Sequence, residues 1–138
     1  MSAFDVETVS LDGGATALGW SGGGTTLVID RPNGAGGRGL GFNGGQLLNL
    51  AVAGCISNDL FREAAKRGLV LTRVAVRVRC DYLGDPAMAT PIEFDIEIAG
   101  EADEAALRDL VAHVDRIAEI PNSLRRGTEV RLADVRVG

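Results

Sequence analysis

Two cysteines and one histidine are the side chains of this chain best suited to nucleophilic or metal chemistry. Cys55 and Cys80 lie 25 residues apart, which fits neither a Cys-x-x-Cys metal pair nor a disulfide framework. His113 is the only histidine, so a zinc site would lack ligands. We therefore expect two free thiols and no metal or other cofactor.

Cys55 lies midway along a helix predicted over about residues 43–66. Asn43 is a good N-cap, Gln46 can reach back to the cap amide, and Gly68 can end the helix in the left-handed conformation. The effect of the helix dipole fades within the first turn, so a reactive Cys55 needs a cationic or hydrogen-bonding neighbour brought by the fold. Two interpretations stay open: a small core residue or a nucleophile.

The two halves of this helix differ in polarity. Residues 47–56 are apolar on nearly every face, which is typical of a helix enclosed by other structure. In the second half, one stripe is expected to face the core, and it consists of Ile56, Leu60, Phe61, Ala64 and Ala65. The residues expected to face solvent are Asn58, Asp59, Arg62, Glu63, Lys66 and Arg67.

Three short strands are predicted before the helix, over residues 4–10, 15–20 and 25–30, because glycine-rich turns separate alternating apolar segments. The glycine-rich segment 34–45 matches no phosphate-binding motif. A mobile connector is the predicted role of this segment, with Arg38 as its only cation.

Two long strands, two helices and a last strand are predicted after the cysteine helix. Residues 74–82 and 92–98 alternate in polarity, so that arginines on the first strand can lie opposite acids on the second. Asp103 is expected to cap a helix that carries a semi-exposed His113, and Pro121 is expected to open a short helix over residues 121–126. Residues 128–137 read as a final strand with a bulge at 133–134. Cys80 is expected to point inward.

Composition limits the class of protein. The 138 residues, 46% apolar and 24% charged, fit one domain over residues 1–138. A net charge of -5 argues against a nucleic-acid surface. The longest apolar stretch is too short to span a membrane, and residues 1–5 lack the pattern of a signal peptide, so we expect a cytoplasmic protein.

The order of these elements resembles the OsmC/Ohr family of thiol peroxidases. Residues 43–56 are similar to the family segment Asn-Pro-Glu-(Glu/Gln)-Leu-Leu that leads to the peroxide-reacting cysteine, on which Cys55 falls. Residues 121–127 are similar to the family's Cys-Pro-x-Ser segment. The resemblance implies an α+β OsmC-like fold, with antiparallel sheets around a long central helix, in an intertwined homodimer.

The resemblance also implies a chemistry, from which this chain departs. In the family, an arginine and a glutamate hold the thiolate, and a second cysteine resolves the sulfenic acid as a disulfide. Here Ile120 stands where the resolving cysteine is expected, Gly44 and Gly45 replace Pro-Glu, and residues 19–24 contain no arginine. Rapid peroxide reduction is therefore not expected, although Arg38 or Arg31 could supply charge to Cys55 from the loop before the helix, also across a dimer.

Three functions follow as hypotheses. The first is a one-cysteine, thiol-dependent peroxidase of the oxidative-stress response, which acts on small hydrophobic peroxides and uses an external thiol reductant. The second is a non-catalytic homodimer that binds a small apolar ligand. In both, Phe42, Gln46 and Ile120 are expected to line the pocket beside Cys55. In the third, Cys55 is only a core residue and the function lies in surface contacts.

Overall fold

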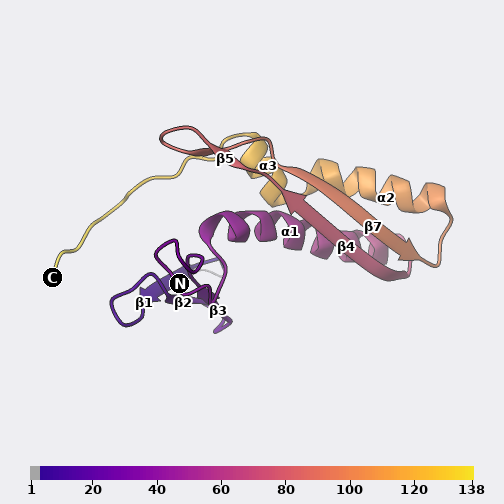
Figure 1. Cartoon of the computed structure of the whole chain (residues 1–138). Helices are drawn as coiled ribbons and strands as arrows, with labels where there is room; N and C mark the ends of the chain where they lie inside the picture. Colours follow the sequence, from indigo (N-terminus) through magenta and orange to yellow (C-terminus); the bar gives the residue numbers. More distant parts are fainter. Residues whose placement is uncertain (1–3) are drawn as a thin grey trace. The chain divides into compact units, whose positions relative to one another are not determined.

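The computed structural model describes residues 4–138, which form a mixed α+β fold of helices and antiparallel sheets (Figure 1). Residues 1–3, on which part of the expectation about a signal peptide rests, lie outside the described residues. The chain divides into two units, residues 1–48 and 49–138, and each is described by itself. A single domain over the whole chain stays a prediction.

The first unit contains a three-stranded antiparallel sheet, which the sequence predicts with ends shifted by one or two residues. Its strands are β1 (Val6–Ser10), β2 (Ala17–Ser21) and β3 (Thr26–Ile29), with β2 in the centre. The turn between β1 and β2 places Asp12 and Gly13 at φ 53° and 66°. An Asp-Gly pair tolerates this left-handed conformation better than most residues, which explains the turn.

The glycine-rich connector between β3 and the cysteine helix is folded, so the prediction of a mobile connector is wrong. The Gly39 N–H donates to the Arg31 carbonyl at 3.0 Å and closes the loop. A Cβ at Gly41 would overlap the Val28 carbonyl, so this close approach requires glycine. The composition suggested mobility because the acceptor that organises the loop, Asp30, precedes the glycine-rich segment.

Helix α1 (Gly44–Lys66) begins and ends as predicted. The Gln46 N–H donates to the Asn43 side chain at 2.9 Å, and the Asn43 N–H donates to the Gln46 side chain at 3.0 Å. This reciprocal pair is a capping box. Gly68, at φ 66°, ends the helix. These local signals fix the position of Cys55 in the middle of α1.

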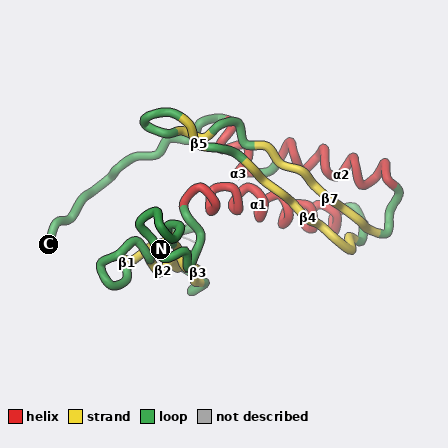
Figure 2. The backbone as a smooth tube through the Cα atoms, viewed as in Figure 1, coloured by secondary structure: helices red, strands yellow, loops and turns green. Residues whose placement is uncertain are grey.

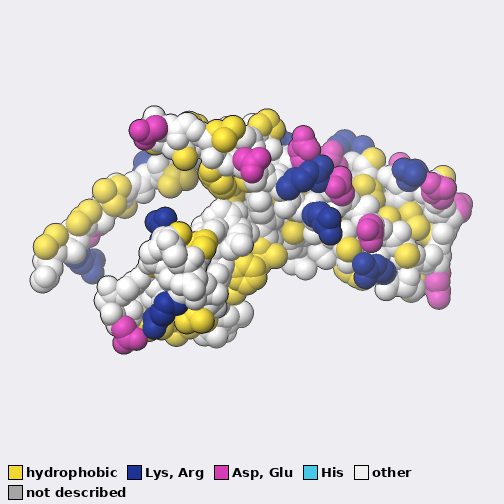
Figure 3. Space-filling model, viewed as in Figure 1, with side chains coloured by type: hydrophobic (Ala, Val, Ile, Leu, Met, Phe, Trp, Pro, Cys, Tyr) yellow, Lys and Arg dark blue, Asp and Glu magenta, His cyan; other side chains and the backbone are white. Residues whose placement is uncertain are grey.

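The second unit contains the long antiparallel pair of β4 (Leu71–Arg79) and β7 (Glu93–Gly100). Opposite charges face each other on the outer side of this pair, as predicted, and Figure 3 shows them intermixed over the sheet. Arg79 lies 2.6 Å from Asp95 and 3.1 Å from Glu93. Cross-strand pairs of this kind favour the observed register.

A short hairpin extends the two strands. It consists of β5 (Tyr82–Leu83) and β6 (Met88–Ala89), and the turn between them contains Gly84 at φ 96°. The predicted strand 74–82 is therefore divided between β4 and β5.

Helices α2 (Glu104–Ile117) and α3 (Glu119–Arg125) follow β7. Asp103 caps α2 as predicted, because its side chain accepts the Ala106 N–H at 2.8 Å. Helix α3 starts two residues before the predicted start at Pro121, which is buried.

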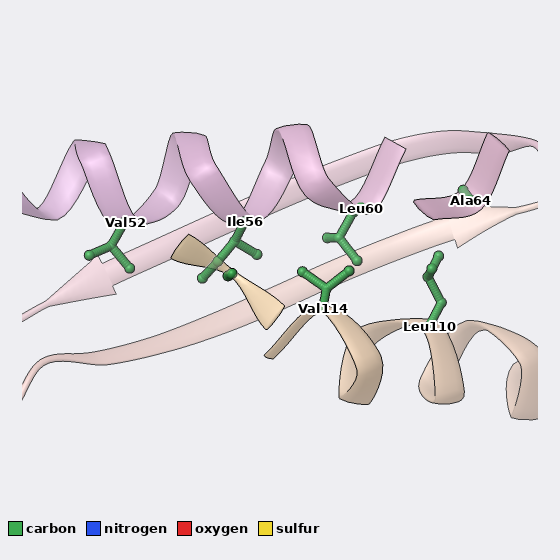
Figure 4. Close-up of a cluster of buried hydrophobic side chains, with 7 residues drawn as sticks. Val52, Ile56, Leu60, Ala64, Leu110 and Val114 are labelled. Atoms are coloured by element: carbon green, nitrogen blue, oxygen red, sulfur yellow. The ribbon is translucent and has the colours of Figure 1, made fainter. Parts of the chain in front are cut away.

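The core of the second unit lies where α1 faces α2, with side chains of both helices pointing toward one another (Figure 4). Partly buried residues of β4 and β7 pack against this core. The buried side chains are Val52, Ile56, Leu60, Ala64, Leu110, Val114 and Ala118. Full burial of one large aliphatic side chain contributes roughly 1.5–3 kcal/mol. This packing determines which face of α1 is covered.

The covered face of α1 differs from the predicted one. Leu50 and Phe61 are 47% and 48% exposed, although the sequence indicates that both are enclosed. Asp59 and Glu63 are only 6% exposed, although the sequence assigns them to the solvent face. The reason is that a single chain covers one side of α1, and the ion pairs of Arg62 allow two acids to lie beside the core.

Residues 128–137 form no strand, so this prediction and that of a bulge at 133–134 are wrong for the single chain (Figure 2). Within the described residues, no hydrogen bond between two backbone groups follows that of the Thr128 N–H. Val130 and Val137 are 95% and 94% exposed. Figure 3 shows a row of hydrophobic side chains along this segment. A strand needs a neighbouring strand for its backbone groups, and this segment has none there.

Candidate functional site

Cys55 is a free, half-buried thiol that packs against the core of the second unit. Val52 and Ile56, which flank it on the helix, are 2% and 0% exposed. At the adjacent Gly54, a Cβ would find no atom within 4 Å. The thiol therefore lies at the boundary between an apolar core and an uncovered helix face, which suits a small apolar reactant better than a charged one.

A row of charged side chains begins one helical turn after Cys55. Arg62 Nη1 lies 3.1 Å from Asp59 Oδ1, and Arg62 Nε lies 3.1 Å from Glu63 Oε1. Lys66 Nζ lies 2.8 Å from the same Glu63 oxygen. The sequence analysis missed this row because it assigned all these residues to a solvated face. Acid and base at a spacing of three residues could have indicated ion pairs along the helix.

Glu63 also connects α1 to α2. Its Oε2 lies 3.4 Å from His113 Nε2, and the His113 side chain is 29% exposed, which confirms the semi-exposed position predicted for it. Hydrogen bonds from Lys66 and Arg62 lower the pKa of Glu63 to about 2, although burial opposes this. His113 therefore faces a carboxylate that stays ionised in mildly acidic solution.

Cys80 follows β4 and faces Asn49 of α1. The Asn49 side-chain amide donates to Cys80 Sγ at 3.5 Å, and Sγ lies 3.6 Å from Asn49 Oδ1. Burial and the neighbouring Cys80 thiol raise the pKa of the Tyr82 hydroxyl. The half-buried position agrees with the predicted inward orientation. No disulfide joins Cys80 to Cys55.

Arg38 belongs to a polar cluster of the first unit around Asp30, which is 2% exposed. The Asp30 carboxylate accepts the Thr16 hydroxyl at 3.0 Å and the backbone N–H groups of Arg31, Arg38 and Leu40 at 2.8, 3.2 and 3.2 Å. Burial acts to raise the pKa of Asp30, but these hydrogen bonds hold it below its ordinary value. Arg38 Nε donates to the Thr16 hydroxyl at 3.0 Å, which orients the guanidinium.

The residues predicted to line a pocket lie in both units. Phe42 is 41% exposed, and the Gln46 side chain is used by the capping box. Ile120 is 37% exposed at the second position of α3. Arg38, Phe42 and Gln46 belong to the first unit, and Cys55 and Ile120 to the second. A site that joins them stays a prediction.

Two further properties concern the described part of the chain. No group of three or more His, Cys, Asp or Glu side chains within residues 4–138 could hold a metal ion. None of the helices there has both the length and the hydrophobicity that crossing a bilayer requires.

The family assignment rests on the sequence that surrounds this site. The family model of the OsmC-like proteins matches residues 36–133, which include α1, both long strands and the two later helices. The chain belongs to the OsmC-like protein family. A search of curated proteins finds no match for it.

Solved structures share the fold of this OsmC-like protein at low sequence identity. An OsmC-like protein from Mycoplasma pneumoniae has a TM-score of 0.76 and 16% identity, with 90% of this chain and 88% of that chain covered. An organic hydroperoxide resistance protein OsmC from Legionella pneumophila has a TM-score of 0.63 and 16% identity, with 91% and 92% covered. A candidate organic hydroperoxide resistance protein from Vibrio cholerae, with captopril bound in one of its active sites, has a TM-score of 0.60 and 19% identity, with 91% and 87% covered. These similarities confirm the predicted α+β OsmC-like fold.

Proposed function

We propose that this OsmC-like protein is a one-cysteine, thiol-dependent peroxidase that reduces organic hydroperoxides through Cys55 in the response to oxidative stress. The observation that carries the proposal is the free thiol of Cys55 at the edge of the apolar core. The structural similarity to organic hydroperoxide resistance proteins supports it. Apolar surroundings suit a peroxide with a hydrocarbon group.

The reaction needs only one cysteine and an external thiol. The Cys55 thiolate attacks the terminal oxygen of the hydroperoxide, so an S–O bond forms and the O–O bond breaks. Sulfur loses two electrons, and the alkoxide takes up a proton and leaves as an alcohol. Two molecules of an external thiol then reduce the sulfenic acid to the thiol, with release of water and a disulfide. The proposed cytoplasmic location would supply such thiols.

A homodimer is part of the proposal, because the single chain leaves much apolar surface uncovered. On α1, Leu50 and Phe61 are about half exposed, and Gly54 between them would allow a second helix to approach closely. A second copy with its own α1 against this face would cover both side chains. The segment 128–137 alternates in polarity and would become a strand in a sheet of the partner.

Peroxide consumption tests the proposed activity. We expect the protein to consume cumene hydroperoxide with dithiothreitol as reductant, and we expect Cys55→Ser to abolish turnover. Cys80→Ser is the matched control and should retain turnover, because that thiol already faces Asn49. Dimedone should label Cys55 after peroxide treatment, because it reacts with sulfenic acids. Absence of turnover and of labelling, or turnover unchanged in Cys55→Ser, would refute the proposal.

A non-catalytic binder of a small apolar ligand is the second candidate. Two substitutions favour it. Ile120 stands where the family has its resolving cysteine, and Gly45 stands where the family has its glutamate. Native mass spectrometry and thermal unfolding with a library of fatty acids and acyl esters would test it. A bound ligand together with a Cys55 that does not react with peroxide would support this candidate. No bound ligand and no change in the unfolding temperature would refute it.

A further inference from the structure

The charged row on α1 lies on the same side of the helix as Cys55. At 3.6 residues per turn, Asp59 and Arg62 lie within about 60° of each other around the helix axis, with Cys55 between them. Helical side chains lean toward the N-terminus, so both charged groups lean toward the cysteine. Residues one turn apart have Cβ atoms about 5–6 Å apart.

Asp59 has a carboxylate oxygen that the rest of the described chain does not use. Its side chain is 8% exposed and its Oδ1 is held by Arg62, yet the buried Oδ2 has no hydrogen-bond partner there. An unpaired buried carboxylate oxygen is unfavourable and rare, so it indicates strain, a role in chemistry, or a partner outside the single chain. Its position one turn from a thiol favours the chemical role.

Arg62, about two helical turns after Cys55, supplies a cation beside Asp59. Its Nη1 binds Asp59 and its Nε binds Glu63, which leaves Nη2 without a hydrogen bond among residues 4–138. The Arg62 side chain is 49% exposed, so this nitrogen can meet a ligand. Glu63 is itself held by Lys66 and faces His113, which gives Arg62 a fixed support.

We propose that Asp59 and Arg62 form the carboxylate–guanidinium pair that activates Cys55 and positions the hydroperoxide. This rests on the proposed peroxidase function and replaces, from the cysteine's own helix, the glutamate and arginine that are missing at Gly45 and over residues 19–24. Asp59 Oδ2 accepts the proton of the Cys55 thiol, directly or through one water molecule. Arg62 Nη2 donates to the peroxide oxygen that becomes the alkoxide.

Protons and electrons balance in this step. The thiol proton moves to Asp59, the sulfur forms a bond to the terminal peroxide oxygen, and the O–O bond breaks. The alkoxide, stabilised by Arg62, then takes the proton back from the Asp59 carboxylic acid, so the pair returns to its starting state. No direct hydrogen bond joins Sγ and Oδ2 in the free protein. Catalytic hydrogen bonds often form only when the reactant is bound.

The test compares variants in a Cys80→Ser background, so that Cys55 is the only thiol. The rate constant for oxidation of Cys55 by cumene hydroperoxide is measured by stopped flow from pH 5 to 9. We expect Asp59→Asn to slow oxidation at pH 7 about 100-fold and to change the pH profile, because loss of a general base has effects of this order. Asp59→Glu should recover part of the rate.

Matched controls separate this role from a purely structural one. Asp109→Asn removes a carboxylate that pairs with Arg67 at 3.3 Å in an exposed position, and it should leave the rate unchanged. Arg62→Met should lower the rate more than Arg62→Lys does. Urea unfolding of each variant shows whether it is folded. An oxidation rate and pH profile unchanged in folded Asp59→Asn would overturn the inference.

A second readout distinguishes failure of the inference from failure of the proposed function. The pH dependence of iodoacetamide alkylation at Cys55 reports thiol activation without any peroxide. If peroxide turnover is absent but Asp59→Asn slows alkylation, the peroxidase proposal fails and thiol activation by Asp59 is supported. If turnover is present and neither rate depends on Asp59, the inference fails alone. Absence of turnover together with unchanged alkylation refutes both.

Discussion

Replacement of Gly54 by alanine gives opposite results for a single chain and for the proposed dimer. Gly54 lies in the interior of α1, where alanine is favoured over glycine by about 1 kcal/mol. A Cβ at this position meets no atom within 4 Å, so the single chain offers no steric penalty. An isolated chain should therefore gain about 1 kcal/mol, which raises Tm by about 3–5 °C.

The proposed dimer reverses this sign. Gly54 lies on the same face as Leu50 and Phe61, and overpacking a covered face costs about 1–3 kcal/mol, which outweighs the helix-propensity gain. We expect Gly54→Ala to weaken the dimer, as seen in sedimentation velocity and in urea midpoints that depend on protein concentration. The control is Ala112→Gly on the exposed side of α2, which measures the change in unfolding free energy that helix propensity alone causes between alanine and glycine. A more stable Gly54→Ala protein with unchanged assembly would refute the reasoning.

Three further predictions concern stability and the connector. Leu60→Ala should lower the free energy of unfolding by about 2–5 kcal/mol in urea titrations, because the side chain is 0% exposed. The pKa of Glu63 is about 2 in the folded chain and 4.5 in the free side chain, so its contribution to stability is complete above about pH 4.5 and is lost as the pH falls toward 2. Glu63→Gln should flatten this part of the profile of urea midpoints against pH. Asp30→Asn should speed hydrogen exchange at the Arg38 amide, and Asp12→Asn in an exposed turn should not.

The ends of the elements could be predicted where the signals are local. Asn43, Gln46 and Gly68 act within a few residues of the ends of α1, and all three perform their predicted roles. The pairing of β4 with β7 was readable because charges of opposite sign alternate on both strands. Residues 128–137 show the limit: alternation indicates that a segment can form a strand, but the neighbouring strand is not encoded in the segment itself.

The candidate site was predictable only in part. Cys55 was identified from its residue type, its place on α1 followed from the helix ends, and the resemblance to the family assigned it the role of the peroxide-reacting cysteine. Asp59 was missed because a charged residue among other charged residues is expected to face solvent. Its burial depends on how α1 packs in the fold, which the local sequence does not indicate. The order of the glycine-rich connector was missed for a similar reason, since it depends on the carboxylate of Asp30 at its start.

The hydrogen bonds of Asp30 limit where this protein can be engineered. The Asp30 carboxylate accepts backbone N–H groups eight and ten residues further along the chain. An insertion or deletion between Asp30 and these two N–H groups would move them out of reach of the carboxylate. A side chain at Gly37 would overlap the Arg31 carbonyl, whereas residues 32–36 are exposed. A label or a randomised library in this loop must therefore keep the loop length and the glycines at 34 and 36, which lie at φ 83° and 93°, and can vary the exposed side chains at positions 32, 33 and 35.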